Sequence, residues 1–296
     1  MKKEHLLSVN LLSILFFSAC SANEEPTPNF GAENDENEPF ELIIKYDGKT
    51  YSEQAHLEND SLVFLDSEFG NFYNSVIKAA PNMAVLTYKD NLDRDVVEYY
   101  NNEEQLLKES GLSFFDQTAQ DQAQFESRGG ESKPVASGTV GRACLYDDKT
   151  FKDRDITLDI TQTLMWTIPD LKVFDNFNDK TSSIRVFNFL QPYQLYSPCN
   201  PNKLLDPTFY SEYGYTLRTC LIGYEDTNYG GKKLFCVSRE AKAIDLSLSL
   251  EEMKQVYHCD WRLSKIGWND KISSLVFRIV RVEDVNGTII VPHPSF

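Results

Sequence analysis

The sequence predicts a multi-domain chain, in which a small α+β domain precedes an all-β domain of the sandwich or Greek-key type. Short runs of alternating apolar and polar residues, as at Ile156, Leu158 and Ile160, recur between turn signals in the C-terminal half. A series of landmarks occurs twice in the same order within that half, which indicates two copies of one unit. In the N-terminal half, strand-like runs flank a segment with helical spacing.

Residues 1–20 have the features of an export signal. A basic start precedes an apolar run, residues 6–17, which is too short to span a bilayer comfortably. The run ends in Phe17-Ser18-Ala19-Cys20, which resembles a lipobox, so we expect Cys20 to become a lipidated N-terminus. A plain signal peptide is the alternative. The lipobox predicts an exported protein, lipid-anchored to a bacterial membrane and facing the periplasm or the cell surface.

The rest of the chain divides by composition. An acidic, polar stretch follows the signal and lacks the apolar residues needed for a core, so we expect a disordered tether. A second polar stretch, rich in Gln, Ser, Gly and Asp, indicates a linker. The predicted order is therefore a tether at 21–39, an α+β domain at 40–115, a linker at 116–138 and a β domain at 139–296.

The α+β domain has clear local signals. Asp47-Gly48 is a tight-turn pair between two strand-like runs. Phe69, Tyr73 and Ile77 recur at helical spacing, and Pro81 follows the expected helix end. No catalytic constellation is visible here. The expected strands are 41–46, from 49 onward, 61–66, 83–88 and 96–100, and the expected helices cover 69–77 and 103–109.

The charge balance constrains the partners. The formal net charge is -16 at pH 7. Such a balance argues against the phosphate backbone of nucleic acids and against anionic membrane surfaces as partners. It is compatible with bound cations, although solubility alone explains most of these carboxylates.

The duplication in the C-terminal half has matching landmarks at both ends. The first copy begins Arg142-Ala143-Cys144-Leu145, and the second begins Arg218-Thr219-Cys220-Leu221. Each continues into an aromatic, acidic hairpin segment that starts at Tyr146 or Tyr224. Each later reaches a near-identical hexapeptide, residues 178–183 with the sequence NDKTSS or residues 269–274 with the sequence NDKISS.

These landmarks resemble those of the βγ-crystallin superfamily. Residues 224–231 match its hairpin signature, and both hexapeptides match the pattern (Asn/Asp)-(Asn/Asp)-x-x-(Ser/Thr)-Ser of calcium-binding members. The resemblance covers roughly 139–282. In the first hairpin Asp153 stands where the family has Gly, and the stretch 188–216 between the copies is unusually long. The resemblance implies a Greek-key domain of two motifs that binds calcium.

Calcium prefers hard oxygen ligands, which Asn, Asp, Ser and backbone carbonyls supply. The resemblance implies that each ion lies between one hexapeptide loop and the hairpin loop of the other motif. Lys180 and Lys271 would contribute only carbonyls, and we expect their ammonium groups to face solvent. The low formal charge predicts affinities of roughly 10⁻⁶ to 10⁻³ M. A plain turn followed by a strand start is the alternative. The expected ligands are Asp147, Asn178, Asp179, Lys180, Ser182, Glu225, Asn269, Asp270, Lys271 and Ser273.

The cysteines point to a disulfide, which an exported protein permits. Six cysteines are present, so an odd number remains if Cys20 carries lipid. Cys220 and Cys236 flank the second hairpin, which predicts a bond between them and leaves Cys144 as the candidate free thiol. Capture of either partner by Cys199 or Cys259 is the alternative.

No motif supports catalysis. The sequence contains no H-E-x-x-H pair, G-x-S-x-G elbow or P-loop. We therefore expect a non-enzymatic, calcium-binding structural or binding module. The resemblance also admits an inhibitor of secreted proteases, which an exposed loop within 193–215 would favour. Calcium-dependent glycan binding is a third reading, with Trp166, Trp261 and Trp268 as a platform, although core packing explains such residues more often.

Overall fold

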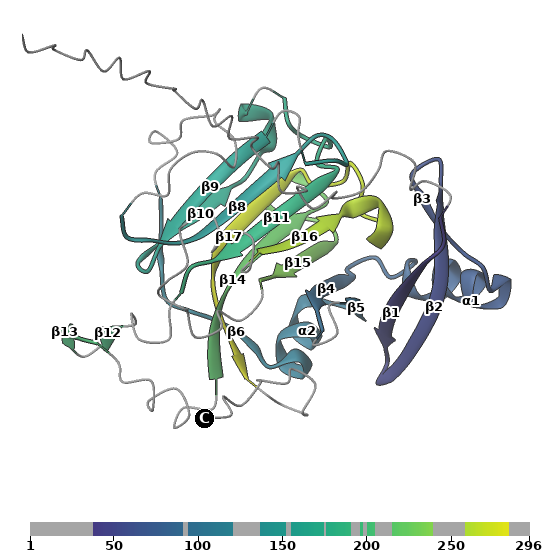
Figure 1. The fold of residues 1–296 in the computed structure, drawn as a ribbon, viewed down its shortest axis with the longest axis horizontal. Helices are drawn as coiled ribbons and strands as arrows, with labels where there is room; N and C mark the ends of the chain where they lie inside the picture. The colour runs from purple at the N-terminus through teal and green to yellow at the C-terminus, as the bar shows by residue number, and fades with distance from the viewer. Residues whose placement is uncertain are drawn as a thin grey trace, which may run out of the picture. The chain divides into compact units, whose positions relative to one another are not determined.

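The computed structural model describes residues 38–90, 94–120, 137–151, 155–174, 176–190, 196–197, 200–204, 215–238 and 258–283. The fold is mainly β, which the sequence predicted for the C-terminal half. It has one large mixed sheet, a small antiparallel sheet of four strands, and two short helices (Figure 1). A separate pair of very short strands, β12 (Tyr196–Ser197) and β13 (Asn200–Leu204), completes the described strands.

The N-terminal elements follow the predicted order. Two tight turns with positive φ connect the first three strands: Asp47 and Gly48 in one, Asn59 and Asp60 in the other. The Asp66 side chain caps α1, so the third strand ends two residues earlier than predicted. The elements are β1 (Phe40–Tyr46), β2 (Lys49–Glu58), β3 (Ser61–Phe64), α1 (Ser67–Phe72), the π-helix η1 (Tyr73–Ile77), β4 (Ala84–Lys89), β5 (Asp95–Tyr100), α2 (Glu103–Ser110), β6 (Leu112–Phe114) and β7 (Thr118–Ala119).

The repeated segment forms the same four strands twice. The first copy gives β8 (Thr139–Tyr146), β9 (Asp155–Thr161), β10 (Leu164–Ile168), the 3-10 turn η3 (Leu171–Val173) and β11 (Ser183–Asn188). The second copy gives β14 (Tyr215–Tyr224), the 3-10 turn η4 (Thr227–Tyr229), β15 (Lys233–Val237), β16 (His258–Arg262), the 3-10 turn η5 (Leu263–Ile266) and β17 (Ser274–Glu283). Each hexapeptide ends at the start of the fourth strand of its own copy.

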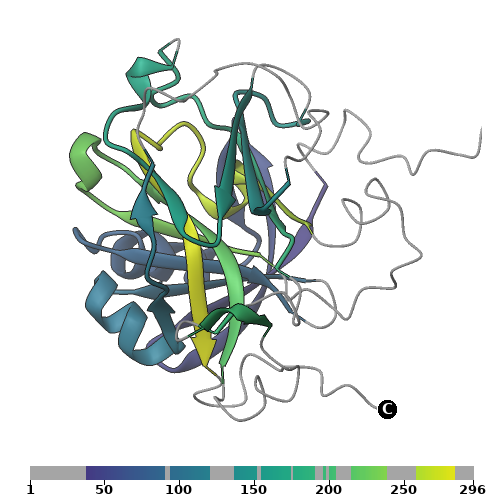
Figure 2. The same ribbon diagram turned by 90° about the vertical axis from the view of Figure 1, so that its left-hand side faces the viewer.

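The two copies exchange their third strands. The small sheet has the order β16-β11-β8-β9, so β16 of the second copy sits beside three strands of the first. Within the large sheet the order β15-β14-β17-β10 places β10 of the first copy beside three strands of the second. Figure 2 shows the long strands β14 and β17 running side by side, as their continuous antiparallel register requires. Neither copy therefore completes its own sheet.

The large sheet also joins the repeat to the N-terminal segment. β4 pairs in parallel with β15, from Lys233 opposite Ala84 to Cys236 opposite Thr87. β5, β1, β2 and β3 extend the sheet beyond β4. On the far side, β6 pairs with the end of β17. The segments predicted as separate domains thus share one sheet, which runs across the predicted linker boundary.

The main core lies between the faces of the two sheets that belong to the repeat. Inward residues from both sheets, such as Leu145 and Ile184 on one side and Leu221 and Phe277 on the other, form one buried cluster. A second cluster lies on the opposite face of the large sheet, where α2 packs through Leu106. The alternation of facing residues along each strand produces these two layers.

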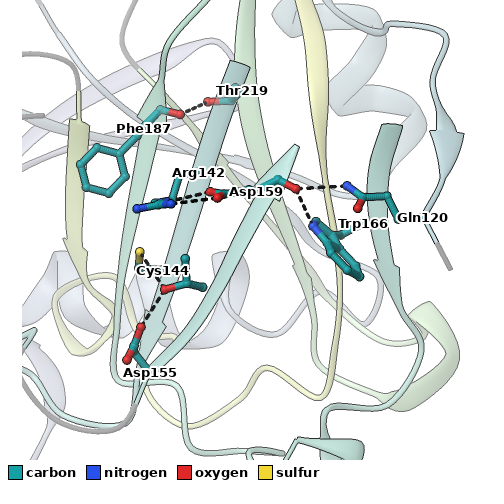
Figure 3. Close-up of polar contacts among 9 residues, drawn as sticks. Gln120, Arg142, Cys144, Asp155, Asp159, Trp166, Phe187 and Thr219 are labelled. Carbon is teal, nitrogen blue, oxygen red and sulfur yellow. Dashed lines mark hydrogen bonds and ion pairs between the residues drawn. The ribbon is translucent and has the colours of Figure 1, made fainter. Parts of the chain in front are cut away.

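An ion pair between a buried arginine and a partly exposed aspartate fastens β8 to β9. Arg142 is 1% exposed, and its guanidinium binds both carboxylate oxygens of Asp159, at 2.7 and 2.8 Å (Figure 3). The Asp159 carbonyl accepts hydrogen bonds from Trp166 Nε1 at 2.7 Å and from Gln120 Nε2 at 3.1 Å. These bonds satisfy a backbone carbonyl on the outer edge of β9, where no further described strand pairs, so Gln120 and Trp166 cover part of this edge.

Candidate functional site: two interlocked hexapeptide loops

Both hexapeptides form the same tight turn. Their second residues, Asp179 and Asp270, have positive φ values of 51° and 52°. Asp enters this left-handed region more readily than most residues because its short polar side chain bonds locally. The turn carries the next residues into β11 and β17, so one loop sits at the start of a strand of the small sheet and the other at the start of a strand of the large sheet.

The loops contact each other reciprocally. Ser273 Oγ donates a hydrogen bond to Asp179 Oδ1 at 2.7 Å, and Ser182 Oγ donates to Asp270 Oδ1 at 3.0 Å. The backbone repeats the exchange, because Asp179 N donates to Ile272 O at 3.2 Å and Asp270 N donates to Thr181 O at 3.1 Å. The fifth residue of each hexapeptide therefore meets the second residue of the other.

The first residues of the hexapeptides complete the arrangement. Asn178 Nδ2 donates to Asp179 Oδ2 at 2.6 Å, and Asn269 Nδ2 donates to Asp270 Oδ2 at 2.9 Å. The amide oxygens of both asparagines are buried and have no hydrogen-bond partner. A buried oxygen without a donor is destabilising, and a cation relieves this cost as well as a hydrogen bond does.

The hairpin loops supply the third component. Ser182 N donates to Tyr146 O at 2.8 Å and Ser273 N donates to Tyr224 O at 2.9 Å. The serine that follows in each hexapeptide contacts the residue two positions after the tyrosine. Ser183 Oγ donates to Asp148 O at 2.6 Å, and Ser274 Oγ donates to Asp226 O at 2.7 Å. Asp147 and Glu225 lie between the contacted residues, so each adjoins one fifth-position serine.

The predicted residues thus gather in two oxygen sets, and each set draws on both copies. In the Asp179 set, Asn178 and Asp179 of the first hexapeptide meet Ser273 of the second copy, and Lys180 and Glu225 are its further predicted members. In the Asp270 set, Asn269 and Asp270 of the second hexapeptide meet Ser182 of the first copy, and Lys271 and Asp147 are its further predicted members. Sequence reasoning missed the sixth-position serines Ser183 and Ser274, although their repetition in both hexapeptides was a visible signal.

The two third-position lysines behave differently. Lys180 is exposed, as expected. Lys271 departs from the expectation: it is partly buried, and its Nζ donates to Gly267 O at 2.5 Å. Burial, together with the nearby ammonium groups of Lys78 and Lys232, lowers the pKa of Lys271. Lys271 lines a pocket together with Tyr73 of η1 and with Lys78, whereas Lys180 is not among the residues of that pocket.

The donor chemistry of both sets fits a hard cation. Carboxylate, amide, hydroxyl and carbonyl oxygens are what calcium prefers, and two oxygens bound to one calcium ion lie about 3 Å apart. The Ser–Asp oxygen separations of 2.7 and 3.0 Å match that spacing. Across the described ranges, no three His, Cys, Asp or Glu side chains gather at one point.

The expected Cys220–Cys236 bond does not form in this structure. Both residues are buried and lie outside any disulfide, as do Cys144 and Cys259. The strand register explains this, because Cys220 faces Val237 while Cys236 faces Leu221. The offset of one residue sends the two side chains to opposite faces of the sheet, into two different clusters. Burial raises the pKa of both thiols.

Other expectations meet the structure only in part. Cys20 and Cys199 lie outside the described residues, as do Asp153 and most of the 193–215 loop. In the part of the chain that the structure describes, no helix is both long and apolar enough to cross a membrane. Trp166, Trp261 and Trp268 are all core residues, at most 6% exposed, and do not form a surface platform.

Comparison with known proteins gave no relatives. No protein-family model matches the chain, and no curated protein or solved structure matches it.

Proposed function

We propose that this chain is a non-catalytic calcium-binding module, exported and held at a membrane by lipid on Cys20. The observation that carries the proposal is the reciprocal contact between the hexapeptides, in which Ser273 meets Asp179 and Ser182 meets Asp270. Two loops that share their oxygens in this way form two equivalent cation sites across the interface of the two copies.

We also propose that residues 139–283 are a βγ-crystallin-like pair of Greek-key motifs. The exchange of third strands between the two sheets supports this classification. So do the matching aromatic corners: Tyr146 packs edge-on against Phe151 at 5.7 Å between ring centroids, and Tyr224 packs edge-on against Tyr229 at 5.4 Å. Phe151 and Tyr229 both have positive φ, so the two hairpins share an unusual backbone as well.

The proposed role of calcium is to hold the two copies together. When bound, the ion supplies positive charge to the carboxylates and to the amide oxygens that now lack donors. The chain's own residues do the rest: Asp179 and Asp270 provide one carboxylate per set, and the serines and backbone carbonyls fix the spacing. A ligand that binds only the folded state stabilises it by about 2.7 kcal/mol at a hundredfold excess over Kd.

The alternatives differ in their support. The Ser–Asp contacts also satisfy both aspartates without any ion, so an interlock that needs no metal is the direct competitor. For glycan binding, the burial of the three tryptophans leaves no platform of those residues. For protease inhibition, the relevant loop falls mostly outside the described residues.

Isothermal titration of the full chain with calcium tests the proposal, beside thermal melts with calcium and with excess chelator. The full chain is required because removing residues 40–115 would expose the paired edge of β15. We expect saturable binding and a rise of several degrees in Tm. Magnesium should do little, because its octahedral shell suits carbonyl-rich loops poorly. An unmoved Tm with no heat up to several millimolar calcium would favour the metal-free interlock.

Two aspartate variants provide a matched control. Asp179→Asn removes a carboxylate from one oxygen set, whereas Asp116→Asn makes the same charge change at an exposed position away from the loops. We expect Asp179→Asn to weaken calcium binding and Asp116→Asn to leave it unchanged. Equal effects of both variants would mean that net charge, and not the site, attracts the ion.

The lipid anchor needs its own test. Cys20→Ala should move the protein from the membrane fraction to the soluble fraction, because the lipid attaches to that thiol. Mass spectrometry of the mature chain gives the direct readout. An unmodified mature N-terminus at another residue would contradict the anchor without affecting the calcium proposal.

A further inference from the structure

A small pocket lies where the second hexapeptide loop meets the N-terminal segment. Its volume is about 20 Å³, which is room for one water-sized group such as an oxygen of a larger anion. Lys78, Lys232 and Lys271 line it together with a single carboxylate, that of Glu225. Three ammonium groups against one carboxylate make this pocket locally cationic in a chain of net charge -16.

The π-helical turn η1 shapes one wall of the pocket. Lys78 N donates to Tyr73 O at 2.8 Å, across five residues. In an α-helix, residues five apart point about 140° away from each other, whereas the wider π turn brings them towards the same side. Tyr73 and Lys78 both line the pocket as a result. Single π turns occur frequently at functional sites.

The floor of the pocket offers a further hydrogen-bond donor. Tyr73 and Tyr99 are buried, and their hydroxyl groups bond to each other at 3.0 Å. This bond uses one of the two hydroxyl hydrogens, so the other remains as a donor. The walls next to it are Gly267 and Trp268. A side chain at 267 would approach Tyr73 Oη at 3.2 Å, so glycine keeps this part of the pocket open.

The lysines are held in place but retain hydrogens for a ligand. Lys232 Nζ donates to Lys78 O at 2.7 Å, and Lys271 Nζ donates to Gly267 O at 2.5 Å. An ammonium group has three hydrogens, so each keeps two after these bonds. The backbone contacts fix where these two charges lie, and Lys78 is exposed to solvent at the pocket.

We propose that this pocket binds one oxygen of a small oxyanion, the chemistry shared by phosphate, sulfate and a terminal carboxylate. The ligand accepts hydrogen bonds from the lysine ammonium groups and a tyrosine hydroxyl. Because the pocket joins η1 to the second hexapeptide loop, the anion ties residues 40–115 to the repeat. This site shares Glu225 and Lys271 with the oxygen sets, but it takes an anion through lysine side chains, whereas Lys271 can offer a cation only its carbonyl oxygen.

Titration calorimetry of the full chain with sodium phosphate tests the proposal, after removal of divalent cations so that calcium cannot contribute. Sodium sulfate and sodium acetate form parallel arms, which separate tetrahedral oxyanions from carboxylates, and sodium chloride keeps the ionic strength constant. We expect saturable binding with millimolar affinity for at least one of the three anions. Absence of saturable heat with all three would overturn the proposal.

Four variants locate the site. Lys78→Gln and Lys232→Gln should each weaken binding about tenfold, since a hydrogen bond to a charged group contributes roughly that factor. Lys108→Gln, an exposed lysine on α2, should change nothing. Glu225→Gln removes the opposing carboxylate and should tighten binding. Equal affinities for all four variants, each shown by melting to be folded, would place the anion elsewhere and contradict the proposal.

Discussion

The two copies of the repeat build the same strands and the same loop contacts, but their surroundings differ. In the first copy, Lys180 is exposed and the sheet ends at β9, whose edge Gln120 and Trp166 cover. In the second copy, Lys271 is partly buried and the sheet continues from β15 into β4. The repeated residues therefore determine the internal contacts, while segments outside the repeat decide what each loop meets. This difference leads to tests that address each copy separately.

The largest effect is expected in the first copy, at the pair of Arg142, which is buried, and Asp159, which is partly exposed. Asp159→Ala removes a carboxylate that accepts two hydrogen bonds from the guanidinium, while the side chain of Arg142 stays buried. Losing hydrogen bonds between charged groups costs about 2 to 3 kcal/mol in the free energy of unfolding. Chemical denaturation measures this loss.

The control lies on the same strand. Asp155 accepts a hydrogen bond from the neutral hydroxyl of Thr157 at 2.8 Å, so Asp155→Ala should cost only about 1 kcal/mol. Equal losses for the two variants would show that the Arg142 pair contributes nothing special to the first copy.

A smaller effect compares equivalent backbone positions. Asn176 and Gly267 each stand two residues before a hexapeptide, and both have positive φ, 56° and 73°. Gly267→Ala should cost about 1 to 2 kcal/mol in unfolding free energy, because it strains the backbone and approaches Tyr73 Oη. Asn176→Gly should change it by less than about 0.5 kcal/mol. Thermal melts of the two variants measure both losses. A larger loss of stability for Asn176→Gly than for Gly267→Ala would contradict the proposed difference in surroundings.

The smallest effect on stability at neutral pH is expected in β4 and β5, the strands that extend the sheet of the second copy. Tyr88 and Tyr100 donate hydrogen bonds to Glu98 at 2.6 and 2.5 Å, and burial, then the Glu98 charge, raises the pKa of both phenols. The unfolded chain releases these protons near pH 10 while the folded chain keeps them. Stability should therefore be unaffected below about pH 10 and fall as the pH rises further.

Ultraviolet titration and denaturation at several alkaline pH values measure this behaviour. Tyr88→Phe should flatten the decline, since phenylalanine has no proton to lose. A decline of the same slope in that variant would assign the pH dependence to other groups.

The local parts of the fold could be predicted because their signals are local. Asp47-Gly48 requires positive φ at a hairpin, and Phe69, Tyr73 and Ile77 repeat at helical spacing, so both elements follow from short windows. The hexapeptides could be recognised in the sequence because two near-identical copies of a six-residue pattern rarely arise by chance. The parallel pairing of β4 with β15 has no such signal, because it joins segments far apart in the chain.

The errors at the site have the same origin. The predicted Cys220–Cys236 bond assumed a symmetrical hairpin, and a register offset of one residue turns the two thiols to opposite faces. The orientation of Lys271 depends on η1, which precedes it by almost two hundred residues and is not part of the repeat. A pattern within one short stretch of sequence cannot reveal a strand register or a contact with a distant segment.

Calcium stoichiometry in double variants tests most directly whether each proposed calcium site is shared between the two copies. Asp179→Ala with Ser273→Ala removes two ligands of one oxygen set, whereas Asp179→Ala with Ser182→Ala removes one ligand from each. Titration of the full chain should show one remaining site in the first double variant and two weakened sites in the second. The opposite result, with one intact site left only in the Asp179–Ser182 variant, would mean that each hexapeptide binds its own ion and would contradict the sharing.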